Sequence, residues 1–325
     1  MNKYSQINTK TWSIMGANGV IGVAAMELAE LNENIMVLTA DQSLNSGLTR
    51  FKKNFPNKYI NMGISEQNMI NVAAGLAKEG FNPFVTAQAP FMSMRSTDQV
   101  RVSLGYMKLG VKILGLSAGF SQGEYGATHH CINDLAIMRS IPNLVVLSPA
   151  DCTATYKFIT AMATSSLPVY IRLTGVTHNP IVYKEEPSFK IGGSNVLKSG
   201  TDITILATGT MVKEGLKASE LLEKKGFSVK VVDMYCIKPI DKGAILDSFD
   251  SKMIFTIEEH SIIGGLGGAV SEILATYRNA PPLSIIGAMD AYIHADEYHV
   301  LLSNSGLIYN KIANRIEKDF LELNK

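Results

Sequence analysis

Short, continuously apolar segments recur along the chain, and most are followed by a segment that reads as a helix. In the first half these apolar segments are 35–38, 84–85, 111–114, 144–147 and 169–171. Strands that are apolar at every position are typical of a sheet that is covered on both faces. Helices are predicted between them, among them 68–78 and 151–164. Strands that alternate with helices predict a parallel sheet with right-handed crossovers.

A second block with the same alternation follows a break in the pattern. The segment 180–193 has two prolines, two glycines and mixed charge, which is typical of a linker between domains. Beyond it, the strands 203–206, 229–232, 253–256 and 284–286 alternate with the helix 212–224 and a helix after residue 264. We therefore expect an α/β protein with two consecutive domains of mainly parallel sheet. The predicted boundaries are 1–180 for the first domain, 181–193 for the linker and 194–325 for the second domain.

Composition narrows the possible partners. The chain has 30 Lys and Arg against 29 Asp and Glu, so its net charge of +1 predicts no surface for nucleic acid or anionic membranes. We expect no apolar run of about 18 residues that would span a bilayer, and the first ten residues lack the apolar segment of a secretory signal. Three scattered cysteines are typical of reduced thiols. These features predict a cytoplasmic protein with no metal site of its own.

The first motif with candidate chemistry is GISEQ at 63–67, which precedes a helix that is apolar on almost every face. Such a helix lies in the interior or at a large subunit interface. Glu66 falls in its first turn, where burial is expected and the helix dipole favours negative charge. Taken alone, however, this glutamate could simply cap the helix.

Two further motifs are glycine-rich. GEYGATHH at 123–130 combines a tight loop with paired histidines before a predicted helix at 133–139, and polar loops at strand ends bind ligands in parallel sheets. Adjacent histidines do not easily face one metal, so a surface pair is the alternative. GGLGG at 264–268 could cradle a phosphate, but it lacks the lysine of a P-loop. Close packing of turn and helix is the favoured interpretation there.

In this order and spacing the motifs resemble the pyrimidine-binding and C-terminal domains of transketolase and of deoxyxylulose-phosphate synthase. The resemblance runs from about residue 13 to the end of the sequence. Its carriers are GISEQ (63–67), DQVR (98–101), GEYGATHH (123–130), IPN (141–143), SP with Asp151, KP (238–239) and EEHSIIGGLGG (258–268).

The resemblance implies thiamin diphosphate as cofactor, which carries the difficult carbanion chemistry while the protein positions it. Glu66 matches the glutamate that hydrogen-bonds N1′ of the aminopyrimidine ring and so activates the cofactor. His129 matches a substrate-side histidine able to donate to a developing oxyanion or to sugar hydroxyls. Further positions that align with cofactor contacts are Asp41, Phe91, Met92 and Arg95.

The resemblance also implies a partner subunit. In this family an N-terminal domain with a Gly-Asp-Gly motif binds the diphosphate and a divalent metal, and this sequence has no Gly-Asp-Gly. We expect a split enzyme in which an N-terminal subunit supplies that domain together with Mg²⁺ or Ca²⁺. Two copies of each chain would then form an α2β2 heterotetramer.

Departures from the family pattern concern the substrate. Tyr125 stands where the family has an aspartate that reads hydroxyl configuration, Ser117 where it has a histidine, and Gly175 where it has a phosphate-binding arginine. Arg172 occupies an earlier position and, like Tyr125 and His129, is a candidate substrate contact. Because arginine is the usual ligand of phosphate monoesters, these changes predict weak affinity for phosphorylated pentoses. We expect transfer of a two-carbon ketol unit from a ketose to an aldose or an unusual sugar, unphosphorylated or nucleotide-linked.

Three other functions stay open at this point. The β subunit of a 2-oxoacid dehydrogenase E1 shares the two-domain plan and the need for a partner. A deoxyxylulose-phosphate synthase-like enzyme is the second alternative. The third is a non-catalytic assembly subunit, although a structural relic would have no need for a buried carboxyl at Glu66.

Overall fold

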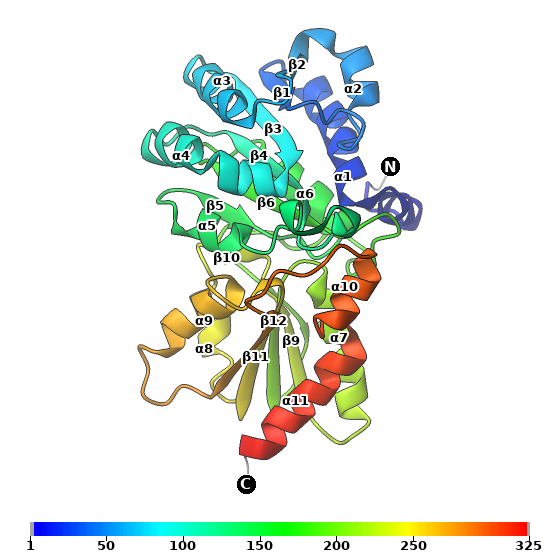
Figure 1. Ribbon diagram of the computed structural model, residues 1–325, viewed down its shortest axis with the longest axis vertical. Coiled ribbons are helices and arrows are strands. Elements are labelled where there is room, and N and C mark those ends of the chain that lie inside the picture. The colour runs from blue at the N-terminus through cyan, green and yellow to red at the C-terminus, as the bar shows by residue number, and fades with distance from the viewer. Residues whose placement is uncertain (1–2, 324–325) are drawn as a thin grey trace.

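The structure is a computed structural model that describes residues 3–323 and contains two sheets, stacked along the long axis of the molecule (Figure 1). The first sheet has the strand order β10-β5-β6-β4-β3-β1-β2, and the second has the order β12-β11-β8-β9-β7. Within these sheets, the pairs β10–β5 and β7–β9 are antiparallel, and every other recorded pair is parallel. The predicted fold class, two α/β domains with mainly parallel sheets, is therefore confirmed.

The first sheet is built mostly from the first half of the chain. Its strands are β1 (Ile35–Thr39), β2 (Tyr59–Asn61), β3 (Asn82–Gln88), β4 (Lys112–Ala118), β5 (Val145–Leu147), β6 (Val169–Thr174) and β10 (Cys236–Lys238). Its helices are α1 (Gln6–Leu31), α2 (Thr49–Asn54), α3 (Glu66–Lys78), α4 (Thr97–Gln99), α5 (Asp134–Ser140) and α6 (Cys152–Met162). Shorter helical turns are η1 (Pro56–Lys58), η2 (Phe91–Arg95), η3 (Val100–Tyr106) and η4 (Gly123–Thr128).

Helices cover both faces of this sheet, which explains why its strands are apolar at successive positions. Leu38 and Val85 belong to the core that includes α3 and α5, whereas their neighbours Val37 and Phe84 belong to the core that includes α1 and α6. Successive side chains of a strand point to opposite faces, so a strand buried on both sides shows no alternation.

Helix α1 was not predicted. Its apolar residues are spread around the helix, so the period of 3.6 residues is weak, and it bends at Gly16, where φ is +75°. By length and composition it could cross a membrane, contrary to the expectation from the sequence. Half of that stretch is nevertheless buried in the protein, and Trp12 stacks on Tyr156 of α6 with ring centroids 4.4 Å apart. We therefore describe α1 as a core helix.

The second sheet follows in the chain and lies below the first in Figure 1. Its strands are β7 (Asn195–Lys198), β8 (Ile203–Ala207), β9 (Val229–Asp233), β11 (Met253–Ser261) and β12 (Leu283–Ala288). The helices around it are α7 (Met211–Glu223), α8 (Lys242–Leu246), α9 (Leu266–Leu274), α10 (Tyr298–Asn304) and α11 (Tyr309–Leu323). Strand β10 lies between β9 and β11 in the chain but extends the first sheet, so the two halves share one element.

The glycine-rich turn before α9 is closed by a carboxylate of the protein itself. Glu258, which is fully buried, accepts hydrogen bonds from the backbone N–H groups of Leu266 and Gly267, each at 2.7 Å. A helix N-terminus that is already paired with an internal carboxylate is not free to bind phosphate. This geometry agrees with the predicted packing role of the turn.

Candidate active site

The candidate site lies at the carboxyl edge of the first sheet, where β1, β3 and β4 all end. Asp41 follows β1, Phe91 and Arg95 follow β3, and the loop with His129 follows β4. Glu66 begins α3, between β2 and β3. Parallel strands that end together bring these segments, which are far apart in the sequence, to the edge where such sheets bind ligands.

Glu66 is buried, with 4% of its surface exposed. Both carboxylate oxygens accept hydrogen bonds from Nη1 of Arg95, at 3.2 and 3.0 Å. Among the described residues, no backbone N–H group of α3 donates to this carboxylate, and Ser65 at the N-cap turns its hydroxyl to the carbonyl of Met62. Glu66 therefore does not act as a simple helix cap.

The Arg95 guanidinium also lies over an aromatic ring. Its central carbon is 4.1 Å from the centroid of Phe91, which is half-buried. Nearly half of the Arg95 side chain is exposed, at 46%, so this group can leave its position at modest cost. Glu66, Arg95 and Phe91 together form a carboxylate, a planar cation and an aromatic face in direct contact.

The histidine loop completes this cluster. The ring of His129 lies edge-on to Phe91 at 5.4 Å between centroids and tilted against Tyr125 at 4.9 Å. The Thr128 hydroxyl lies 3.0 Å from Nδ1 of His129, which helps to fix the orientation of the ring. The structure thus brings together Glu66, Phe91, Arg95, Tyr125 and His129, all of which the sequence predicted as site residues.

The neighbouring His130 points the other way. It is buried, its Nε2 lies 3.1 Å from the carbonyl of Gly123, and its ring is perpendicular to that of Phe120. The two histidines therefore cannot share one metal ion, as expected from their adjacency. Among residues 3–323 there is also no group of three or more His, Cys, Asp or Glu side chains placed to hold a metal.

The cluster fits an aminopyrimidine ring. The Arg95 guanidinium is planar, donates N–H groups to the Glu66 carboxylate and lies on the face of Phe91. An aminopyrimidine is likewise planar, and its protonated N1′ would donate to the same carboxylate while the ring lies on the same aromatic face. The side chain of Arg95 thus occupies the kind of position that the ring of the cofactor would take.

Two predicted site residues lie in the interior, and their predicted roles are corrected. Met92 is fully buried and packs in the core between the first sheet and α3, so its thioether does not face a ligand. Arg172 has only 1% of its side chain exposed, and its guanidinium forms an ion pair with Asp134 at 2.9 Å. A group already satisfied inside the protein is not free to bind a substrate.

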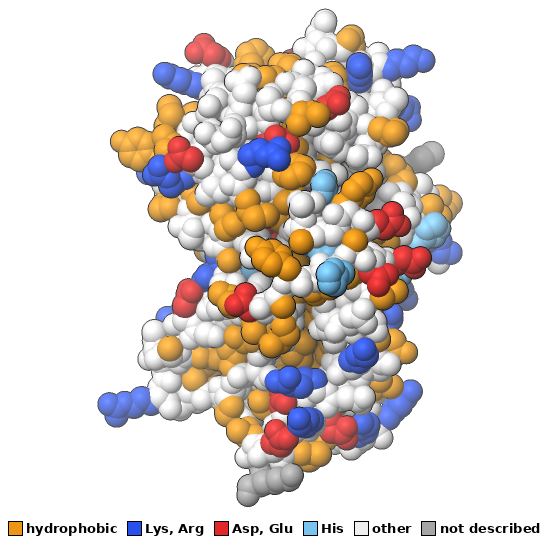
Figure 2. All heavy atoms as spheres, in the orientation of Figure 1, with side chains coloured by type: hydrophobic (Ala, Val, Ile, Leu, Met, Phe, Trp, Pro, Cys, Tyr) orange, Lys and Arg blue, Asp and Glu red, His pale blue; other side chains and the backbone are white. Residues whose placement is uncertain are grey.

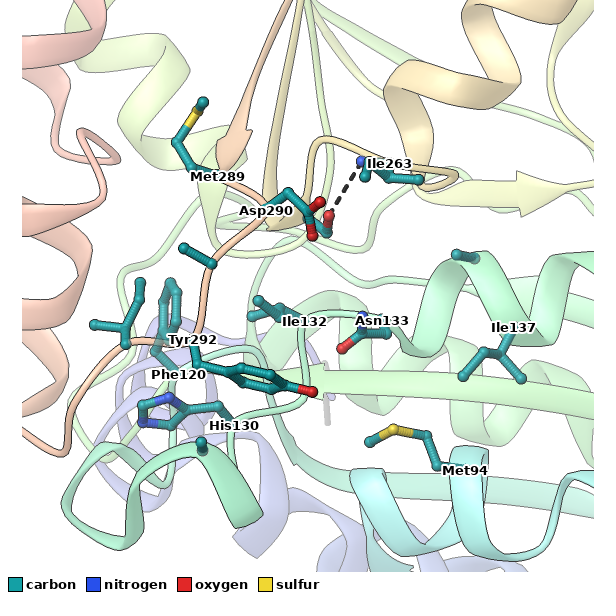
Figure 3. A pocket seen from close by; sticks show the side chains of 15 residues that line it. Met94, Phe120, His130, Ile132, Asn133, Ile137, Ile263, Met289, Asp290 and Tyr292 are labelled. Carbon is teal, nitrogen blue, oxygen red and sulfur yellow. Dashed lines mark hydrogen bonds between the residues drawn. The ribbon is translucent and has the colours of Figure 1, made fainter.

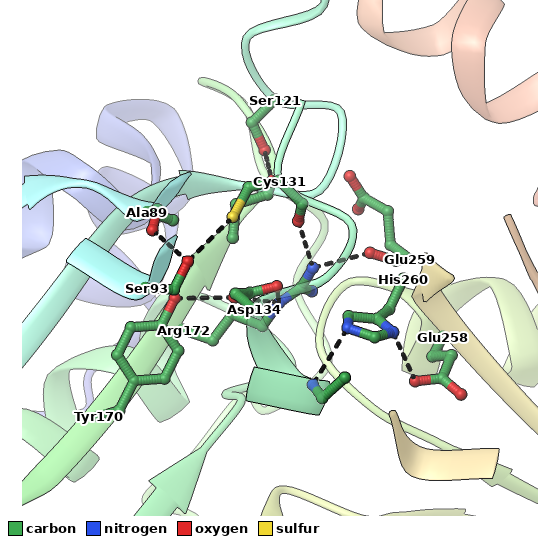
Figure 4. A network of polar contacts seen from close by, with 12 residues as sticks. Ala89, Ser93, Ser121, Cys131, Asp134, Tyr170, Arg172, Glu258, Glu259 and His260 are labelled. Carbon is green, nitrogen blue, oxygen red and sulfur yellow. Dashed lines mark hydrogen bonds and ion pairs between the residues drawn. The ribbon is translucent and has the colours of Figure 1, made fainter. Parts of the chain in front are cut away.

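Figure 4 shows what Arg172 does instead. Its Nη2 donates to the backbone carbonyl groups of Cys131 at 3.2 Å and Glu259 at 2.8 Å. The Glu259 side chain in turn accepts from the backbone N–H of Phe120 at 2.7 Å. Burial raises the pKa of the Glu259 carboxyl, and Arg172 opposes this rise. Arg172 therefore joins the two halves of the molecule.

Asp41 lies on the correct edge but is exposed. It has a φ of +56° and exchanges two hydrogen bonds with Asn61, at 3.0 and 3.1 Å. Its contact with the cofactor stays a prediction.

The second domain supports the histidine loop through residues that the sequence analysis missed. The loop 289–297 lies against η4, where Asp296 donates its backbone N–H to the carbonyl of Gly123 at 3.2 Å. A Cβ atom at Gly123 would lie 2.4 Å from the carbonyl oxygen of Asp296, so only glycine permits this approach. Between this loop and α5 lies a cavity of about 550 Å³ with Tyr292, His130 and Met94 among its lining residues (Figure 3). The segment 289–297 has no regular pattern from which its position could have been predicted.

The same face is apolar over much of its area. In Figure 2, hydrophobic side chains and histidines gather where the two halves of the molecule meet. Ile64 beside the GISEQ turn, Tyr125 on η4 and Tyr292 are all more than 60% exposed. Large apolar side chains that gather on one surface are typical of a face that meets another protein.

Comparison with known proteins identifies the class to which this fold and site belong. Residues 17–175 match the family described as "Transketolase, pyrimidine binding domain", and residues 192–312 match "Transketolase, C-terminal domain". The chain belongs to the transketolase family. It is 41% identical to a "Putative transketolase C-terminal section" of Methanocaldococcus jannaschii over 92% of this chain and 94% of that protein.

Two further relatives describe the kind of transketolase. One of the two subunits of an apulose-4-phosphate transketolase from Phocaeicola vulgatus is 37% identical over 87% of this chain and 90% of that protein. A solved structure described as "Split gene transketolase, inactive beta4 tetramer" has a TM-score of 0.86 and 38% identity, and the match covers 94% of this chain and 98% of that one. The chain is thus similar over nearly its full length to subunits of split transketolases.

Proposed function

We propose that this chain is the C-terminal subunit of a split, thiamin-diphosphate-dependent transketolase. It would transfer a two-carbon ketol unit from a ketose to an aldose together with an N-terminal partner subunit. The observation that carries this proposal is the buried carboxylate of Glu66, which is paired with a planar N–H donor over Phe91 at the carboxyl edge of the sheet. Its similarity to subunits of split transketolases supports the need for a partner.

In this proposal the chain has three tasks. Glu66 shares a proton with N1′ of the aminopyrimidine, because a carboxyl with little access to water pairs strongly with a ring N–H. Phe91 supports the ring, and His129 donates a proton or hydrogen bond to the oxygen that gains charge during transfer. Thiamin diphosphate supplies the carbanion chemistry when it is bound.

The rest of the assembly follows from what this chain lacks. Its described residues offer no cluster for a divalent metal, so the N-terminal subunit would hold Mg²⁺ or Ca²⁺ with the diphosphate. An α2β2 arrangement would place two active sites between the two kinds of chain. The three cysteines are free and buried, which agrees with a reducing cytoplasm.

The test is reconstitution with the N-terminal subunit and comparison of Glu66→Gln with Glu79→Gln. Gln keeps the shape but cannot share a proton in the same way, so we expect a loss of kcat of about 10²- to 10⁴-fold. Glu79 is exposed at the other end of α3, and its variant should keep full activity. Cofactor binding by the complex, measured by calorimetry, should weaken only for Glu66→Gln.

Other outcomes would favour a different function. Full activity of Glu66→Gln would indicate an assembly subunit. Turnover by this chain without a partner would contradict the split enzyme, and lipoamide-dependent decarboxylation of a 2-oxoacid would identify an E1 β subunit.

A further inference from the structure

A second, smaller depression lies beside the histidine loop, at the carboxyl ends of β4 and β6. Its volume is about 270 Å³, and the bend of α1 at Gly16 and the loop after β1 form its other walls. No charged side chain and no histidine is among its lining residues, all of which are described. Its polar groups are amides and hydroxyls, namely those of Asn18, Asn45, Ser117, Ser121, Gln122 and Thr177.

Ser117 has a hydrogen-bonding capacity that the protein does not use. Its hydroxyl is almost fully buried and accepts N–H bonds from Asn18 at 2.8 Å and Gln122 at 3.3 Å. A serine oxygen has two lone pairs and one proton, so both lone pairs are occupied. Among residues 3–323, no acceptor receives the proton. The O–H group is therefore available to a ligand.

Ser121 shows the contrast. Its hydroxyl donates to the carbonyl of Ala118 at 2.7 Å and accepts from the backbone N–H of Gly175 at 2.8 Å. These bonds join the ends of β4 and β6 and hold the wall of the depression in place. Ser117, at φ +53°, is held in an uncommon backbone conformation close by.

The chemistry of this depression suits an alcohol and not a phosphate. A ligand hydroxyl could accept from Ser117 and donate to the amide oxygens of Asn18 or Gln122, to which no described residue donates. A phosphate dianion can only accept, and here it would meet no positive charge to offset its loss of water.

We propose that this depression is the subsite for the far end of the acceptor sugar, and that it selects an uncharged end that carries free hydroxyls. Ser117, Asn18 and Gln122 are then specificity-determining residues. The proposal rests on the proposed transketolase function and adds the class of acceptor. A two-carbon acceptor is too short to reach the subsite, whereas a four-carbon aldose can extend toward it.

The experiment uses the complex reconstituted with its N-terminal subunit and hydroxypyruvate as a donor that has no sugar end. The acceptors are glycolaldehyde, D-erythrose and D-erythrose 4-phosphate, and kcat/KM is measured for each. We expect the wild-type complex to prefer D-erythrose to its phosphate. Ser117→Ala should lower kcat/KM for D-erythrose about tenfold, through KM, and leave glycolaldehyde unchanged, because one hydrogen bond to the acceptor is lost.

A charge-reversing arm makes the test sharper. Asn18→Lys should raise kcat/KM for D-erythrose 4-phosphate at least tenfold, because it brings a cation into the depression. The matched controls are Ser188→Ala and Asn57→Lys, which are exposed and do not line the depression, and neither should change the preference.

A wild-type preference for the phosphate would overturn the proposal, as would an equal loss with glycolaldehyde for Ser117→Ala. If glycolaldehyde itself is not turned over, the transketolase function fails, and the subsite falls with it.

Discussion

The residues of the site differ in how well the sequence predicted them. Glu66 and His129 stand in motifs whose order and spacing are specific, and the structure places both beside Phe91. The roles predicted for Met92 and Arg172 were wrong because the sequence does not reveal which side of a segment is buried. Nor could it reveal that Asn18 meets Ser117, since 99 residues separate them and only the fold brings them together.

The pairing of Arg95 with Glu66 leads to a prediction at this scale. If the guanidinium occupies the position of the aminopyrimidine, Arg95→Gln should destabilise the cofactor-free complex by about 1 kcal/mol, because it leaves a buried carboxylate without its charged partner. The cofactor-loaded complex should lose less. The measurement is the rise in Tm on adding thiamin diphosphate, which should be larger for the variant than for the wild type.

Arg101→Gln is the control, since Arg101 pairs with Asp98 on the surface with both side chains more than half exposed. An equal loss of Tm with and without cofactor would show that Arg95 does not compete with the ring.

Among the elements, strands were predicted better than helices. All the apolar strands that the sequence indicated are present, because burial on both faces leaves a clear signature. Short or half-exposed strands such as β2 and β7 gave no such signal, and neither did α1, whose apolar residues surround it. Strand β10 was missed because three residues that pair outside their own domain have no local signature.

The packing of α1 depends on a glycine. A Cβ atom at Gly22 would lie 2.0 Å from the backbone carbonyl oxygen of Gly47, which cannot move as a side chain can. We expect Gly22→Ala to lower the free energy of unfolding by about 1–3 kcal/mol. Gly75→Ala in α3 is the matched control, because a Cβ atom there meets nothing within 4 Å. It should instead stabilise the chain by about 0.5–1 kcal/mol, since alanine is the better helix former. Urea denaturation of both variants decides, and a neutral Gly22→Ala would contradict the close approach.

At the scale of the whole molecule, the two sheets are joined by buried polar contacts as well as by the chain. Tyr183, in the segment between the sheets, donates to Asp233 at the end of β9, at 2.6 Å, and its backbone N–H donates to Asp151 at 2.7 Å. The other oxygen of Asp233 is buried, and no described residue hydrogen-bonds to it. Burial raises the pKa of Asp233 to about 8.

This shift predicts how stability changes with pH. The folded state holds a proton on Asp233 up to about pH 8, whereas the unfolded chain releases it near the ordinary pKa of 3.8. The folded state therefore binds more protons in this window, so the free energy of unfolding falls as pH rises from about 4 to about 8. Asp233→Asn should flatten this part of the profile, measured as urea midpoints at several pH values. Asp250→Asn, an exposed control, should follow the wild type, and an unchanged slope in Asp233→Asn would exclude this carboxyl as the source.

Strand β10 has a consequence for anyone who divides this protein. Cutting the gene after residue 193 would yield a first half that has lost the outermost ribbon of its sheet, which the second half contributes. The backbone groups of β5 would then be uncovered along that margin, ready to join a neighbouring molecule and promote aggregation. A fragment meant to be soluble should therefore carry residues 236–238 with it.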